Sequence, residues 1–288
     1  MMRIFVENSI FSIGNSLSSL YRTDNMSKYW VDLHLEEDRM QHQTISSLTV
    51  YLKKVANEIR VAHRYAPAVD EPETTDMIDL EKQLDWTRWA LKEDIREYRL
   101  IPCFPDRPVV IKPEFPFRVS QGAQARIYTR VPVFVRVVPK DYPDFVITEI
   151  PTVVLSNTWF GTFMDGELCY GLPTTARREI ADEMFEPHMA VCTIQIYNNT
   201  EGELNFDNIC LRVDRLSMYI KDDYLWADQT DILYLGEEKL CDIEMKGRLP
   251  EEAKRGKLIT RARTPIRKNF AVRTFQRLRE IQPLGLMH

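Results

Sequence analysis

The sequence lacks the short motifs that mark the commonest enzyme classes. It contains no G-x-S-x-G elbow, no G-x-x-x-x-G-K-[ST] loop and no G-x-G-x-x-G after a strand pattern, so triad hydrolysis and nucleotide-dependent chemistry have no support. The five histidines are scattered and form no H-x-H or H-x-x-x-H pair, which leaves zinc without its usual ligand spacing. We therefore predict no catalytic residue, no metal site and no cofactor, in a protein that is not an enzyme.

Cysteine and long apolar runs are also scarce. The five cysteines are widely spaced and form no C-x-x-C pair, a pattern that favours reduced, buried thiols. No window holds the roughly 18 consecutive apolar residues of a membrane-spanning helix. The first twenty residues also lack the basic and then apolar pattern of a signal peptide. These absences predict a cytoplasmic protein without a transmembrane segment. A partner could associate it with a membrane, and contact of its C-terminal basic segment with the membrane surface stays open.

Glycine is scarcer than proline, with ten residues against sixteen. This balance is typical of short strands joined by rigid turns. Apolar residues alternate with a period of two between Pro, Gly, Asn or Asp residues, which predicts half-buried strands. These strands are expected at residues 29–35, 108–112, 126–138, 193–197, 211–220 and 231–235. Before the basic C-terminal segment, helix is expected only as short turns within 81–98 and 176–185. The fold class is therefore mainly β, with two tandem antiparallel β-sandwich-like modules and a few short helices.

The module boundary is placed in the polar, proline-bearing stretch 140–144. This gives an N-terminal β-rich module over 1–140 and a C-terminal β-sandwich-like module with a basic end over 141–288. Residues 48–65 fit either a helical stripe or two alternating arms, and we favour a hairpin that turns at Ala56 and Asn57. Within 126–138, Pro132 cannot donate to a strand ladder, so this strand lies at a sheet edge or is broken there by a bulge.

The end of the chain carries a net positive charge, whereas the rest is net negative. Residues 248–288 hold eleven Lys and Arg against three Glu, a balance of +8, so residues 1–247 carry −13 within the total of −5. A basic segment of this kind can contact an acidic protein, an anionic membrane surface or its own acidic body. The acidic remainder would repel phosphate, so nucleic acid is not predicted as a partner.

The basic segment itself is expected to be a strand around 258–264 followed by an amphipathic helix over 268–281, although a strand remains an alternative for the second part. Such a helix either docks its apolar side on the second module or offers its arginines to a partner. The candidate partner-binding residues are Arg261, Arg263, Arg267, Arg273 and Arg277.

The most distinctive motif is Leu155-Ser-Asn-Thr-Trp-Phe-Gly161, followed by Asp165-Gly-Glu-Leu-Cys-Tyr170. Its turn-forming residues would display aromatic and acidic side chains on or beside loops. The candidate ligand-binding residues, for a sugar or another small ligand, are Trp159, Asp165, Glu167 and Tyr170. Two alternatives stay open: the Trp-Phe-Gly element plugs the end of a sandwich core, or Asp165 and Glu167 serve as the acid and base of a hydrolase.

Three stretches resemble the recurring sequence motifs of an uncharacterised prokaryotic family, the domain-of-unknown-function 432 family. They are Pro105-Asp-Arg-Pro-Val-Val-Ile-Lys-Pro-Glu114, Leu155-Ser-Asn-Thr-Trp-Phe-Gly161 and Gly166-Glu-Leu-Cys-Tyr170, and the resemblance runs from about residue 46 to 279. It implies no activity and no catalytic residues. The family's association with genes for small mechanosensitive channels implies an accessory role at the cytoplasmic face of a membrane channel.

Together these observations favour a non-catalytic interaction protein that binds another protein, with a membrane channel or a second copy of the chain as candidates. A small-ligand or carbohydrate-binding module is the alternative.

Overall fold

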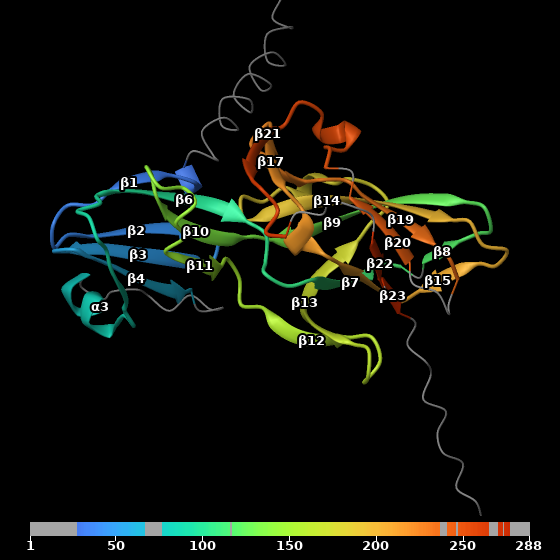
Figure 1. Ribbon diagram of the computed structural model, residues 1–288, viewed down its shortest axis with the longest axis horizontal. Coiled ribbons are helices and arrows are strands. Elements are labelled where there is room, and N and C mark those ends of the chain that lie inside the picture. The colour runs from blue at the N-terminus through green and yellow to red at the C-terminus, as the bar shows by residue number, and fades with distance from the viewer. Residues whose placement is uncertain are drawn as a thin grey trace, which may run out of the picture.

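A computed structural model describes residues 28–66, 77–115, 117–236, 241–245, 247–264, 270–272 and 274–276. Figure 1 shows two groups of strands side by side along the long axis of the molecule. The described chain is mainly β, as predicted, and its one α-helix is the short α3 (Met77–Gln83). Most strand pairs are antiparallel as expected, but β13 with β7 and β14 with β18 and β19 are parallel.

The N-terminal sandwich consists of two four-stranded sheets. One has the order β1 (Asp32–His34), β6 (Glu97–Cys103), β10 (Phe134–Pro139) and β11 (Thr148–Pro151); the other runs β2 (Met40–Ile45), β3 (Leu48–Val55), β4 (Glu58–Tyr65) and β5 (Thr87–Ala90). Their facing sides share one core, in which Leu52 and Ile59 from one sheet meet Leu100 and Val135 from the other. Burying such side chains stabilises each by about 1.5–3 kcal/mol relative to exposure.

The hairpin predicted for 48–65 is confirmed. Strands β3 and β4 pair from Leu48 with Tyr65 to Val55 with Glu58, and the turn falls at Ala56, which has a φ of 50°.

A short helix was expected within 81–98, and this expectation is wrong for most of the range. The helix lies earlier, at α3, and Trp89 instead pairs with Ile59 in the sheet, because cross-strand packing of β-branched and aromatic side chains outweighs a weak helical pattern.

The C-terminal sandwich packs a five-stranded sheet on an eight-stranded one. The first has the order β12 (Ser156–Phe160), β13 (Glu167–Ala176), β7 (Val109–Pro113), β16 (Asn208–Leu211) and β23 (Phe275–Gln276). The second runs β21 (Lys257–Thr260), β17 (Met218–Lys221), β18 (Tyr224–Ala227), β14 (Met189–Asn198), β19 (Thr230–Tyr234), β20 (Cys241–Met245) and β22 (Phe270–Val272), with β9 (Gln124–Pro132) beside β14. Strands β8 (Phe117–Val119) and β15 (Leu204–Phe206) form a separate pair.

The chain crosses between the sandwiches more than once. Strand β9 belongs to the second sandwich and β10 to the first, and they are separated only by Val133. Pro132 ends β9 there, which confirms the predicted break. The boundary placed at 140/141 lies in the turn between the paired strands β10 and β11. No single cut in the sequence separates the two sandwiches, because β7 to β9 come before β10 and β11 in the chain.

Three other segments differ from the sequence expectations. The strand expected over 211–220 is interrupted by a 3-10 turn at Val213–Arg215. In 176–185 only the 3-10 turn Asp182–Met184 forms. The helix expected over 268–281 is wrong for the described residues, which form β22 and β23. There Ala271 pairs with Asp242 and Phe275 with Ile209, and these long-range pairings decide the conformation against the local pattern.

Candidate functional site: the β12–β13 hairpin

Strands β12 and β13 form a hairpin that stands out from the body of the C-terminal sandwich (Figure 1). The two strands pair from Ser156 with Gly171 to Phe160 with Glu167. Strand β12 is the last strand of its sheet, so its outer edge has no partner strand in the described chain. The turn formers predicted at Asp165 and Gly166 lie in the connection. Trp159, Phe160, Glu167 and Tyr170 lie on the two strands that flank it.

Two glycines shape the turn of this hairpin. Gly161 has a φ of 110°, a backbone conformation that favours glycine. A Cβ on Gly166 would lie 2.0 Å from Nε1 of Trp159, so the indole ring rests directly on the Gly166 backbone. The same Nε1 donates a hydrogen bond of 2.9 Å to the carbonyl oxygen of Thr162. The Trp159 ring is therefore fixed against the turn.

A small buried cluster anchors the hairpin at the turn end of its strands. Phe160, Cys169 and Cys210 are almost completely buried together, with Val110 packed against them. The sulfur atoms of the two cysteines lie 3.9 Å apart as free thiols. Their hydrogen bond and burial raise the pKa of Cys210 well above its usual value. This cluster matches the predicted alternative in which the Trp-Phe-Gly element plugs the end of a core, with Phe160 as the plug.

An ion pair closes the same cluster. The buried guanidinium of Arg212 contacts the Glu167 carboxylate at the start of β13 and lies 3.5 Å from the Cys210 sulfur. Because Glu167 already has a cationic partner, its charge is largely compensated.

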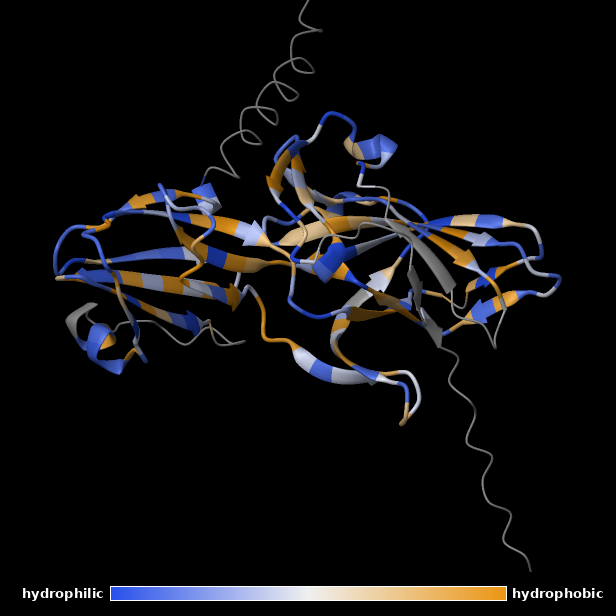
Figure 2. Ribbon diagram, in the orientation of Figure 1, coloured by the Kyte–Doolittle hydropathy of each residue, from blue (hydrophilic) through white to orange (hydrophobic). Residues whose placement is uncertain are grey.

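Several apolar side chains of the hairpin are exposed, although Phe160 beside the turn is buried. Phe163 is 93% exposed, Met164 84% and Trp159 52%, and Figure 2 shows hydrophobic residues at the hairpin tip. We name this set the hairpin surface; it comprises Val154, Trp159, Phe163, Met164 and Leu168. Exposed apolar side chains gathered in one place mark an interaction site more often than a solvated surface.

The free edge of β12 lacks the protection that edge strands usually carry. No residue from 152 to 164 is charged, and none is proline. Four other outer strands carry a charge or a proline: Asp32 in β1, Arg88 in β5, Pro151 in β11 and Lys257 in β21. Strand β2, at the edge of the N-terminal sandwich, carries neither. Charges and prolines on edge strands prevent the pairing of one chain with another. The β12 edge is thus open to strand addition.

The four predicted ligand-binding residues do not converge on one cavity. Trp159 rests on the turn, where the Thr162 hydroxyl lies 3.4 Å from the Asp165 carboxylate, and Glu167 is paired with Arg212. Tyr170 points to another place, where its hydroxyl donates to Asp106 at 2.9 Å. Burial is the main cause that raises the pKa of Tyr170, and this hydrogen bond adds to it.

The predicted partner-binding arginines also do not share one environment. Arg261 is exposed, but Arg263 is turned inward and bonded to the Glu149 carboxylate and the Phe104 carbonyl oxygen. The Arg263 guanidinium, predicted to contact a partner, thus has an anionic partner within the chain. Arg267, Arg273 and Arg277 lie outside the described residues.

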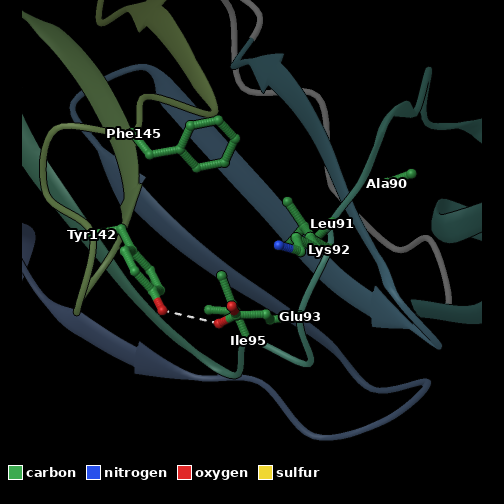
Figure 3. A pocket seen from close by; sticks show the side chains of 7 residues that line it. All are labelled: Ala90, Leu91, Lys92, Glu93, Ile95, Tyr142 and Phe145. Carbon is green, nitrogen blue, oxygen red and sulfur yellow. Dashed lines mark hydrogen bonds between the residues drawn. The ribbon is translucent and has the colours of Figure 1, made fainter.

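A shallow apolar groove of about 240 Å³ lies at the N-terminal sandwich. Figure 3 shows Tyr142 and Phe145, from the β10–β11 connection, on one side and residues 90–95 on the other. The Tyr142 hydroxyl donates to Glu93 at 2.9 Å, and this bond raises the pKa of Tyr142. The sequence analysis missed this groove, because its two walls come from segments that are separate in the chain and carry no motif.

Two further properties concern the described residues. They contain no group of three or more His, Cys, Asp or Glu side chains placed to hold a metal ion. None of their helices is long and apolar enough to span a bilayer.

Comparison with known proteins gives a family but no activity. No curated protein and no solved structure matches the chain. One family matches residues 29–280, so the resemblance expected from residue 46 is confirmed and begins earlier. Because this match covers most of the sequence, the chain belongs to the family described as "Protein of unknown function (DUF432)".

Proposed function

We propose that the protein is a non-catalytic interaction protein, and that it binds another polypeptide by strand addition at the β12 edge. The observation that carries this proposal is the uncharged, unprotected edge beside the exposed apolar hairpin surface. In strand addition, main-chain hydrogen bonds supply affinity and alternate side chains supply specificity. The occupant is an extended segment that is largely uncharged, because β12 itself carries no charged residue and the Arg107 guanidinium beside it already donates to Asn157 at 3.3 Å.

The anchoring of the hairpin supports this function. Phe160, the two thiols and the Arg212 ion pair hold the turn end of the hairpin strands on the sandwich. Trp159 is fixed against Gly166. A surface that is ordered before binding loses less conformational entropy when a partner arrives. The hairpin can therefore bind as a preorganised element.

The carboxylates near the hairpin favour binding over catalysis. Glu167 is compensated by Arg212, and Asp165 is held in the turn by Thr162. A general acid or base needs a free proton position facing a substrate, and neither carboxylate lines a cavity together with the other. The proposal thus assigns these residues to the construction of the hairpin.

Site-specific photo-crosslinking in the native cells tests the proposal. A photoreactive amino acid would replace Trp159 in one variant and Leu258, an exposed residue of β21, in the control. We expect a discrete crosslinked polypeptide from position 159 and none from position 258. A membrane channel among the products would match the accessory role that the family resemblance implies. No crosslink at 159, or equal crosslinking at both positions, would contradict the proposal.

A further inference from the structure

We propose that the occupant of the β12 edge is a second copy of the same chain, joined by antiparallel pairing of β12 with itself. This inference rests on the proposed function and names its partner. A two-fold axis through Thr158 places Thr158 opposite its own copy, Asn157 opposite Trp159, and Ser156 opposite Phe160. An interface of this kind uses the same surface on both molecules, which is the commonest arrangement in homodimers.

Charge is the first argument for self-pairing. Like charges directly opposite each other destabilise a pair of strands, and residues 152–164 contain none. The nearest carboxylates, Asp165 and Glu167, lie in the turn and on β13, one strand behind the edge. The Arg107 guanidinium reaches Asn157 of β12 at 3.3 Å, but it has Asp106 as an anionic neighbour. Two copies of β12 can therefore meet without carboxylate repulsion, although the whole chain carries a net charge of −5.

Burial of the hairpin surface is the second argument. In the register centred on Thr158, Val154 comes opposite Thr162 of the other copy, beside Phe163 and Met164. These three apolar residues are more than three-quarters exposed in the single chain. The contact that pairs the strand edges thus also covers the apolar residues of both hairpins. Each square ångström of apolar surface that it removes from water stabilises the dimer by about 25 cal/mol.

The geometry of the sheet is the third argument. The hairpin projects beyond both sandwiches in Figure 1, so its edge can be approached from outside. Pairing would join two five-stranded sheets into one continuous sheet of about ten strands, which is within the usual limit for an open sheet. It would also remove the two unprotected β12 edges, one from each copy.

Sedimentation of the purified full-length chain over a wide concentration range tests the inference, and we expect a monomer–dimer equilibrium. Two double variants provide a matched comparison, since both lose Trp159. Asn157→Lys with Trp159→Lys brings introduced lysines opposite each other, and Asn157→Lys with Trp159→Glu brings a lysine opposite a glutamate. We expect the dissociation constant of the first to exceed that of the second by about tenfold.

A second measurement keeps the test valid if a double variant does not fold. Residues directly opposite in antiparallel strands have Cα atoms about 4.5–5.5 Å apart, which a disulfide can span. Thr158→Cys should give a disulfide-linked dimer on mild oxidation, whereas Leu258→Cys should not.

A chain that remains monomeric at all concentrations and gives no dimer through Thr158→Cys overturns the inference. If photo-crosslinking at position 159 then still captures a different polypeptide in cells, the proposed function stands and only its partner changes. If position 159 crosslinks nothing, both fail.

Discussion

The Arg263 guanidinium lies 2.6 Å from the Glu149 carboxylate, so the end of the C-terminal sandwich is tied to the N-terminal one. Arg263 also donates to the Phe104 carbonyl oxygen at 2.6 Å. The other oxygen of Glu149 accepts from Nε of Arg136 at 2.7 Å. One carboxylate is thus shared by two guanidinium groups, and all three side chains are at most 20% exposed. This network explains how the positively charged Arg263, which follows β21, can pack between the two sandwiches.

Arg263→Met should destabilise the fold. The substitution leaves Glu149 with only Arg136 and the Phe104 carbonyl oxygen without its donor, and breaking a buried ion pair costs on the order of 3 kcal/mol. Chemical denaturation followed by circular dichroism would measure the loss. Arg261→Met, at an exposed arginine two residues away, is the control and should change stability by less than about 0.5 kcal/mol. Equal effects of the two substitutions would show that the network contributes nothing.

Phe160→Ala should destabilise the protein by about 3 kcal/mol, because it empties the buried cluster under the hairpin. Phe163→Ala is its matched control: the same substitution three residues along, at a side chain that is almost fully exposed. We expect it to leave the free energy of unfolding nearly unchanged. Thermal denaturation of both variants measures the difference. A comparable loss in the two variants would mean that the hairpin does not rest on Phe160.

Local patterns predicted the parts of the fold that depend on neighbours in sequence. The hairpin at 48–65 follows from alternation on both arms and a turn between them, and the break after Pro132 follows from the missing amide proton. The pairing of β22 and β23 with distant strands could not be predicted, since nothing near residue 270 specifies β20 as its partner.

For the candidate site, the sequence identified the motif around Trp159 but not the direction of each side chain. Period two places Trp159 and Phe160 on opposite faces. Which face is buried depends on Cys210 and Arg212, which lie far away in the chain. Arg263 illustrates the same limit: its charge is visible in the sequence, but its partner Glu149 becomes apparent only in the folded chain.

Gly166→Ala should disturb the hairpin tip. Its Cβ would lie 2.0 Å from Nε1 of Trp159 and 2.6 Å from the Thr162 carbonyl oxygen, so the indole must leave its place and lose its hydrogen bond. We expect a loss of about 1–3 kcal/mol and a changed fluorescence of Trp159, measured as the difference from a Trp159→Phe background. Gly202→Ala is the control, because a Cβ there meets nothing within 4 Å. Unchanged fluorescence in the Gly166 variant would contradict the packing of the ring on the turn.

Asp228 should make stability depend on pH in a direction opposite to that of a salt-bridged carboxylate. Burial raises the pKa of Asp228 above 3.8, although the Ser217 amide donates to Oδ2 at 2.8 Å and opposes this shift. The folded state therefore holds the proton more tightly than the unfolded state does. By linkage, the contribution of Asp228 to stability is greatest below pH 3.8 and declines as the pH rises through the folded-state pKa.

Asp228→Asn isolates this contribution, because an asparagine oxygen can still accept from the Ser217 amide but does not titrate. The free energy of unfolding of the wild type minus that of the variant should fall as the pH rises above about 4, and then level off. Denaturant titrations at a series of pH values would measure it. Asp222→Asn, at an exposed aspartate, should show no such fall. A difference that grew with pH would mean that Asp228 is stabilised as a carboxylate, and that burial does not dominate its ionisation.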